Sequence, residues 1–224
     1  VYTEAEEFFL MRLAWEEWKE DNSLGACLAL ILLFYTGLRI GEVVALKRSD
    51  IDGLVAHICR SEVEVSVQID ETTFKQIGHM VIDHPKTSAG FRDVYLTHGG
   101  REVVDAALSG VAARGADDSY LFTNGITRVN VDMVTYRLKK YCNILGIPFR
   151  SAHKIRKTYV SHLIDGGVNI DAARIQVGHE DERTTLRCYT FNTKTQDETN
   201  EQFERALSTL APNPGILGTA NGYR

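Results

Sequence analysis

The sequence predicts an α+β fold that is mostly helical, with a small antiparallel β-sheet on one edge. Apolar residues recur at helical spacing through most of the chain, between capping residues and glycines that mark helix ends. From Val55 to about Leu96 the period changes to two, which is the pattern of β-strands. The 224 residues, 44% of them hydrophobic and 25% charged, suffice for one large domain or two small ones.

A capping box opens the first predicted helix. Thr3 is followed three residues later by Glu6, so each side chain can bind the main-chain N–H of the other residue. Apolar residues then recur at roughly helical spacing through an acidic segment, which indicates an amphipathic helix. The stripe expected to face the core consists of Phe9, Leu13 and Trp18.

The longest apolar run covers residues 24–38. It is shorter than the ~20 residues that a helix needs to cross a bilayer, so no membrane partner is expected. The run predicts instead a core helix over 24–35 that ends at Gly37. A short helix over 40–46 follows, with Arg39 at the joint between the two.

Alternating residues mark the predicted strands. Valine and isoleucine alternate with polar residues from 63 to 69, as expected of a half-buried strand. Further short strands fit 77–83 and 91–96, with a turn at 86–90 between them. These two strands would form a hairpin with Lys86 at its edge.

Helical signals return beyond Gly99-Gly100. The expected N-terminal caps of three of these helices are Asn130, Ser151 and Asn169, whose short polar side chains can accept a hydrogen bond from a first-turn N–H. The helices are predicted over 101–114, 130–145, 151–165, 170–177, 182–190 and 196–210.

Net charge leaves the class of partner open. The whole chain carries −5, which by itself disfavours nucleic acid. Residues 1–38 hold seven acids and two bases, and residues 195–224 hold four acids and two bases. Residues 39–194 therefore carry +2, which is compatible with DNA binding without demanding it.

The cysteines and histidines predict neither a disulfide framework nor a metal site. None of the four cysteines lies within a few residues of another, and the seven histidines show no metal-ligand spacing. We therefore expect no metal, no cofactor and a reducing cytoplasmic compartment. The cysteines are Cys27, Cys59, Cys142 and Cys188.

Four local motifs stand in order along the chain, and together they resemble the tyrosine recombinase (lambda integrase) family over about residues 24–205. All six polar positions expected of that family are filled with the expected residue types. One departure is Lys157, where many members have a second histidine. The motifs are Thr36-Gly37-Leu38-Arg39-Ile40-Gly41-Glu42, Pro85-Lys86-Thr87, His153-Lys154-Ile155-Arg156, and Gly178-His179 ten residues before Tyr189.

The chemistry of these residues suits phosphoryl transfer. A phosphodiester gains charge in its transition state, and always-charged, forked guanidinium groups such as Arg39 and Arg156 can clamp it. His153 and Arg156 are three residues apart on one predicted helix and so share a face. His162 falls on the opposite face, and we interpret it as structural.

The resemblance implies the remaining roles. Tyr189 would be the nucleophile of a site-specific recombinase that forms a 3′-phosphotyrosyl link, with His153 as general base. His179 would donate a hydrogen bond to the phosphate, and Lys86 would protonate the leaving 5′-oxygen. Ordinary alternatives stay open: either histidine could be a packed core residue, and Lys86 a solvated turn lysine.

The resemblance also implies partners and domains. Double-stranded DNA is the expected substrate, with a tetramer assembled on it through a C-terminal helix. Residues 1–194 would form the catalytic domain, 195–210 the exchange helix and 211–224 a disordered tail. Residues 195–210 could alternatively pack on their own domain. The N-terminal core-binding domain of such proteins is expected to be absent from this chain, which would be bacterial or phage-encoded.

Rival functions remain within and beyond this family. A type IB topoisomerase uses a similar tyrosine, but the short motif spacing disfavours it. A housekeeping chromosome-dimer recombinase is closer, although the long alternating segment 55–84 favours an integrase of a mobile element. A DNA-binding regulator without catalysis is the third alternative, and the intact set of six residues speaks against it.

Overall fold

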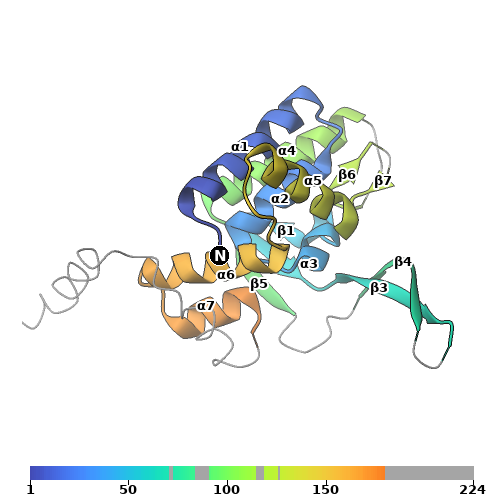
Figure 1. Ribbon diagram of the computed structural model, residues 1–224. Helices are drawn as coiled ribbons and strands as arrows, with labels where there is room; N and C mark the ends of the chain where they lie inside the picture. The colour runs from blue at the N-terminus through green and yellow to red at the C-terminus, as the bar shows by residue number, and fades with distance from the viewer. Residues whose placement is uncertain (71–72, 84–90, 115–118, 126, 180–224) are drawn as a thin grey trace, which may run out of the picture. The chain divides into compact units, whose positions relative to one another are not determined.

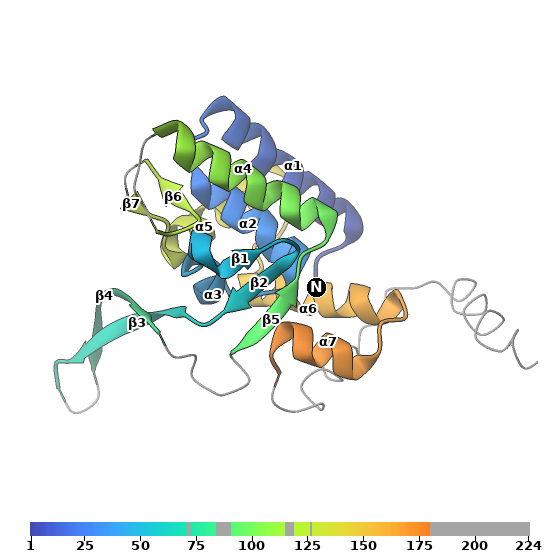
Figure 2. The same cartoon turned by 180° about the vertical axis from the view of Figure 1, so that it is seen from behind.

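The computed structural model describes residues 1–70, 73–83, 91–114, 119–125 and 127–179, with the backbone alone at 111–114. Helices dominate this part of the chain, and short antiparallel strands lie beside them (Figures 1 and 2). The predicted helices beyond residue 179 and the predicted tail lie outside the described residues. The α-helices are α1 Glu4–Glu20, α2 Gly25–Thr36, α3 Ile40–Val44, α4 His98–Arg114, α5 Val131–Ile144, α6 Ala152–Asp165 and α7 Ile170–Val177.

Helix α2 is the centre of the core, as the apolar run predicts. It contacts α1, α4, α5 and α6, and every residue of α2 except the half-buried Tyr35 is buried. A helix that is apolar all round is stable only when neighbours cover every face. The first residue of α2 is Gly25. No side chain fits at this position, since a Cβ there would lie 2.3 Å from the Thr123 carbonyl oxygen. Within the described ranges no helix is long and apolar enough to span a membrane.

Helix α1 confirms the capping box but corrects the predicted stripe. The Thr3 side chain accepts from the Glu6 N–H, and the Glu6 carboxylate accepts from the Thr3 N–H. Phe9, expected in the core, is 43% exposed, because the buried line of α1 runs through Leu10 and Ala14 instead. One residue turns a helix by about 100°, so this small shift moves Phe9 off the packed face. Leu13 and Trp18 are partly buried against the core.

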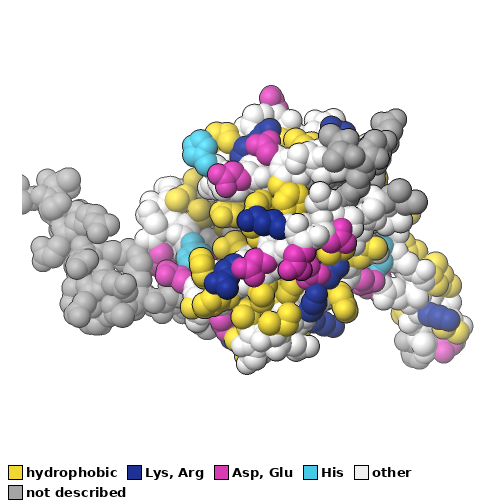
Figure 3. All heavy atoms as spheres, turned by 90° about the horizontal axis from the view of Figure 1, so that it is seen from above, with side chains coloured by type: hydrophobic (Ala, Val, Ile, Leu, Met, Phe, Trp, Pro, Cys, Tyr) yellow, Lys and Arg dark blue, Asp and Glu magenta, His cyan; other side chains and the backbone are white. Residues whose placement is uncertain are grey.

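The acidic side chains of α1 form ion pairs with α5, α6 and the segment between them. Figure 3, looking down from above Figure 1, shows acidic and basic side chains interspersed among hydrophobic ones on that face. His162 belongs to these pairs, and its hydrogen bond with Glu7 raises the pKa of the imidazole. Its position agrees with the structural role expected from sequence. The pairs are Glu6 with Arg150, Glu7 with His162, and Glu17 with Arg137 and Lys140.

Short antiparallel strands form the β-part, as predicted. One sheet has the order β1-β2-β5, and β3 with β4 forms a separate two-stranded ribbon. Strands β6 and β7 form a small third pair. The strands are β1 Ile51–Asp52, β2 Val55–Ile58, β3 Ser61–Gln68, β4 Phe74–Ile82, β5 Arg92–Tyr95, β6 Thr123–Asn124 and β7 Thr127–Arg128.

The predicted hairpin between 77–83 and 91–96 is wrong. Strand β4 pairs with β3, and β5 pairs with β2, so the two predicted partners belong to different sheets. The reason is burial: β5 places Val94 opposite Ala56, and both side chains are fully buried against the helices. Lys86 itself lies outside the described residues.

The ribbon of β3 and β4 extends away from the helices in Figures 1 and 2. The half-buried strand predicted for residues 63–69 is therefore wrong at its outer end, where Val67 is 48% and Ile69 62% exposed. At the root of the ribbon Glu62 is buried. Its carboxylate pairs with Arg128 and accepts a 2.8 Å hydrogen bond from the Val131 N–H, and these contacts compensate for its loss of water. This carboxylate ties the ribbon to the start of α5.

Polar caps begin the later helices. The Asn130 side chain accepts from the Met133 N–H at α5, and the Asn169 side chain accepts from the Asp171 N–H at α7. Ser151 precedes α6 as predicted, but its side chain makes no capping hydrogen bond. Three described cysteines are free thiols, and Cys188 lies outside the described residues.

Candidate active site

The first motif forms a tight turn between α2 and α3. Thr36 donates to the Leu32 carbonyl at 2.7 Å and accepts weakly from the Leu38 N–H at 3.4 Å. Gly37 follows with φ +60°, a conformation that favours glycine. A Cβ at Gly37 would lie 2.2 Å from the Tyr159 ring of α6, so the turn packs directly on that helix.

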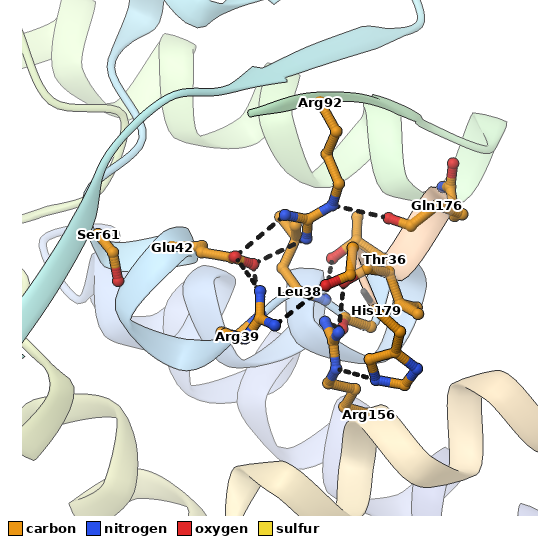
Figure 4. Close-up of polar contacts among 12 residues, drawn as sticks. Thr36, Leu38, Arg39, Glu42, Ser61, Arg92, Arg156, Gln176 and His179 are labelled. Atoms are coloured by element: carbon orange, nitrogen blue, oxygen red, sulfur yellow. Dashed lines mark hydrogen bonds and ion pairs between the residues drawn. The ribbon is translucent and has the colours of Figure 1, made fainter. Parts of the chain in front are cut away.

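Arg156 is buried in α6, at 2% exposure, and it links three segments. Its Nη1–H donates to the Gly37 carbonyl at 2.9 Å and its Nη2–H to the Val177 carbonyl. Its Nε–H donates to His179 Nε2 at 3.3 Å (Figure 4). One guanidinium therefore joins the end of α2, the end of α7 and the fourth motif.

Arg39 approaches the same end of α7 from the start of α3. Its Nη2–H donates to the Gly178 carbonyl at 3.1 Å, and its Nη1–H donates to Glu42 at 2.8 Å. Its side chain is 46% exposed, in contrast to that of Arg156. Carbonyls at a helix C-terminus lack helical partners and carry partial negative charge, so two cations converge on them.

Glu42 is held by a second arginine that sequence reasoning did not single out. Arg92, the first residue of β5, donates from Nη1 and Nη2 to the two carboxylate oxygens at 3.0 and 2.9 Å (Figure 4). Burial alone would raise the pKa of Glu42, but the hydrogen bonds and charge of Arg92, with the charge of Arg39, lower it. Glu42 is therefore a carboxylate shared between two arginines.

Gln176 is another residue that the sequence pattern did not indicate. Its side-chain amide accepts from the Tyr95 N–H at 3.1 Å and donates to the Tyr95 carbonyl at 2.9 Å. The amide thus extends β5 in the way a neighbouring strand would, and docks α7 on the sheet edge. Its main-chain carbonyl accepts from Arg92 Nε–H at 3.1 Å. A lone glutamine in a helix carries no sequence signal for this contact.

His179 follows Gly178, which ends α7 in the left-handed conformation at φ 67°. It is 7% exposed, and burial, with the charges of Arg156 and Arg39, lowers its pKa to about 4. The ring is therefore neutral near pH 7. Because Nε2 accepts from Arg156, the single ring proton is on Nδ1.

His153 lies in the first turn of α6, three residues before Arg156 and exposed. Partial burial and the neighbouring charges of Lys157 and Arg156 lower its pKa. The charge of Arg39 makes a smaller contribution in the same direction. A neutral imidazole at this position can accept a proton near pH 7.

A family model described as the phage integrase family matches residues 11–196. This chain belongs to that family. A XerC-like tyrosine recombinase of Caldanaerobacter subterraneus is 28% identical over 180 residues, 71% of this chain and 44% of that protein. The ICEBs1 integrase of Bacillus subtilis is 26% identical over 163 residues, 70% of this chain and 42% of that protein. The chain spans less than half the length of these curated relatives.

Solved structures confirm the mostly helical α+β fold of the family. The Tn1549 transposon integrase in complex with circular intermediate DNA has a TM-score of 0.66 and 23% identity, covering 92% of this chain and 66% of that chain. XerA recombinase has a TM-score of 0.64 and 18% identity, covering 95% of this chain and 64% of that chain.

Four of the six residues expected from the family resemblance lie in the described part of the chain. The fold brings Arg39, Arg156 and His179 into one hydrogen-bonded cluster at the end of α7, with His153 one helical turn from Arg156. Lys86 and Tyr189 lie outside the described residues, so their roles stay predictions.

Proposed function

We propose that this chain is the catalytic part of a site-specific DNA recombinase, which cleaves and rejoins DNA through a 3′-phosphotyrosyl intermediate during integration or excision of a mobile element. One observation supports the proposal above the others. Arg39, Arg156 and His179, which are far apart in sequence, converge at the end of α7. The similar Tn1549 transposon integrase was solved with DNA, which supports double-stranded DNA as the partner.

The cluster suits a phosphodiester whose charge grows during the reaction. Arg39 is half exposed and can offer N–H donors to nonbridging oxygens, while buried Arg156 adds fixed charge and orients His179. The Nδ1–H of neutral His179 is a further donor. Donors and charges held in place before the reaction cost no reorganisation in the transition state.

Two proton transfers complete the proposed step. The phenol of Tyr189 attacks phosphorus and passes its proton to His153, whose lowered pKa keeps it unprotonated near pH 7. The bond to the deoxyribose 5′-oxygen breaks, and that oxygen takes a proton from Lys86. A 5′-hydroxyl of a second duplex then attacks the phosphotyrosyl bond, and the same transfers run in reverse. The energy of the broken bond is retained in the adduct.

The β3–β4 ribbon supports a mobile-element integrase over a housekeeping chromosome-dimer recombinase. Its strands have 8 and 9 residues, and they lie in the chain between Arg39, at the start of α3, and the segment that contains Lys86. The resemblance associates housekeeping recombinases with a shorter sheet at this position. The names of the similar proteins do not separate the two alternatives, because they include both a XerC-like tyrosine recombinase and the ICEBs1 integrase.

Covalent trapping tests the proposed function. The full-length protein would be incubated with genomic or element-end DNA, and DNA attached to denatured protein would be sequenced. We expect adducts at a small set of related sites, with the ends of a mobile element among them. Adducts confined to a chromosomal resolution site would support the housekeeping alternative. Sequence-specific binding without adducts would support a non-catalytic regulator.

Replacing Lys86 by alanine should slow cleavage of ordinary DNA by ~10²–10⁴-fold, the typical contribution of a general acid. Activity should recover on DNA whose bridging 5′-oxygen is sulfur, because a thiolate leaves without a proton. The measurement is the rate of adduct formation on both substrates. Arg39→Ala is the control and should show no such recovery. Equal rescue of both variants, or of neither, would remove Lys86 from this role.

Residues 195–210 are proposed to form a helix that docks on a neighbouring protomer and supports a tetramer on DNA. The support is a sequence stripe of Phe203, Leu207 and Leu210 beside acidic positions. Deleting 195–224 should leave the fold intact and weaken assembly on two-site DNA, measured by sedimentation and gel shift. Unchanged two-site assembly, or unfolding of the truncated monomer, would mean that this helix belongs to its own domain.

A further inference from the structure

Arg92 lies outside every motif that predicts this site, yet its side chain binds Glu42 of the first motif and Gln176 of α7, two residues before the fourth motif. The side chain is 4% exposed, and its hydrogen bonds to Glu42 and to the Gln176 carbonyl lead in two directions. Nη1 and Nη2 bind both oxygens of Glu42, and Nε binds the Gln176 carbonyl at 3.1 Å. The first contact leads to Arg39 and the second to α7, which is followed directly by Gly178 and His179.

These contacts close a ring around the exposed arginine. Glu42 receives hydrogen bonds from the Arg39 main-chain N–H and from its Nη1–H, both at 2.8 Å. Arg39 Nη2–H in turn binds the Gly178 carbonyl at 3.1 Å, two residues beyond Gln176 on the same chain segment. Arg92 closes the ring by binding both Glu42 and Gln176 (Figure 4).

Resting on the recombinase function proposed above, we propose that Arg92 is a positioning residue. Acting through Glu42, its guanidinium fixes the side chain of Arg39 in the orientation that binds the scissile phosphate. Through the Gln176 carbonyl it holds the end of α7, and with it His179, at a constant distance from Arg39. Arg92 itself is buried and is not proposed to touch DNA.

The shape of the arginine fork makes this role specific to arginine. Two parallel N–H groups match the two carboxylate oxygens, and the third, Nε–H, points to a different acceptor. A lysine ammonium could neutralise Glu42 but could not hold two segments in one fixed geometry. Misplacing a catalytic group by about 1 Å can cost ~10²-fold in rate, so a positioning residue can matter greatly.

The test measures the rate of adduct formation and DNA affinity separately for the full-length protein. Arg92→Met should slow adduct formation ~10–100-fold with DNA affinity nearly unchanged. Compared with Arg92→Met, the Arg92→Lys protein should recover more of the free energy of unfolding than of the rate of adduct formation. Arg137→Met is the matched control, because Arg137 also forms a largely buried pair, with Glu17, away from the site. It should leave the rate unchanged.

A double-variant cycle separates positioning from general damage to the fold. If Arg92 acts through Glu42, the Arg92→Met/Glu42→Gln protein should be no slower than Glu42→Gln alone, since the two changes remove one interaction. The pH profile is a second readout. Loss of Arg92 removes the main group that lowers the pKa of Glu42, so the fall of rate caused by protonation of Glu42 should begin at higher pH than in the parent, in addition to the fall caused by protonation of His153. Multiplicative rate losses with an unshifted profile would overturn the proposal.

An NMR readout is independent of catalysis. The guanidinium signals of Arg39 should be resolved in the parent and in Arg137→Met, and averaged by rotation in Arg92→Met. If the parent forms no DNA adduct but Arg39 is released in Arg92→Met, the recombinase function fails and the positioning link stands. If adducts form normally and Arg39 keeps its resolved signals in folded Arg92→Met, the positioning link fails and the recombinase function stands.

Discussion

Replacing Tyr189 by phenylalanine should abolish the covalent protein–DNA adduct while leaving DNA affinity close to that of the parent protein. The change removes only the oxygen proposed as the nucleophile and keeps the ring, so contacts that depend on the aromatic surface persist. The measurement uses a nicked suicide duplex that carries the trapped site, resolved on a denaturing gel. Gel shift on the same duplex reports affinity.

Tyr136→Phe is the matched control for this experiment. Tyr136 lies on α5 with 63% of its surface exposed, away from the cluster at the end of α7, and its hydroxyl has no part in the proposed reaction. The control protein should form adducts at the parent rate. A covalent shift that persists in Tyr189→Phe would mean that another residue is the nucleophile.

Alanine at Arg39 and at Arg156 should abolish most activity in both proteins but destabilise only one of them. Loss of one preorganised donor to a transition-state oxyanion costs ~10²–10³-fold in rate. Arg156→Ala also leaves the Gly37 and Val177 carbonyls without their buried donor, at ~1–3 kcal/mol each. We expect a fall of roughly 2–6 kcal/mol in its free energy of unfolding.

Arg39→Ala should lower the free energy of unfolding by less than about 1 kcal/mol, because its side chain is half exposed and Glu42 keeps the Arg92 pair. Denaturant unfolding and adduct formation measure the two quantities separately. Equal destabilisation by both variants would show that Arg39 is chiefly a structural tie to α7. A stable Arg156→Ala protein would mean that water replaces the buried guanidinium.

Sequence patterns predicted the local elements well because their determinants lie within a turn of each other. The Thr3–Glu6 box, the Asn130 cap and the apolar α2 are found where the sequence predicts them. The buried stripe predicted for α1 was wrong at Phe9, because Phe9 and Leu10 fit helical periodicity almost equally and the structure buries Leu10. Only the packing against α2 and α5 decides between them.

By itself the sequence determined the order of the described helices, the core helix and the four ordered motifs, and the family resemblance of those motifs predicted a common site for Arg39, Arg156 and His179. Tertiary structure alone decided that β5 pairs with β2 and that Arg92 binds Glu42, 50 residues away. Capping and periodicity act between near neighbours, which a single sequence displays directly. A strand partner or a buried ion pair depends on how distant segments pack, and the identity of an arginine does not reveal which carboxylate it will meet.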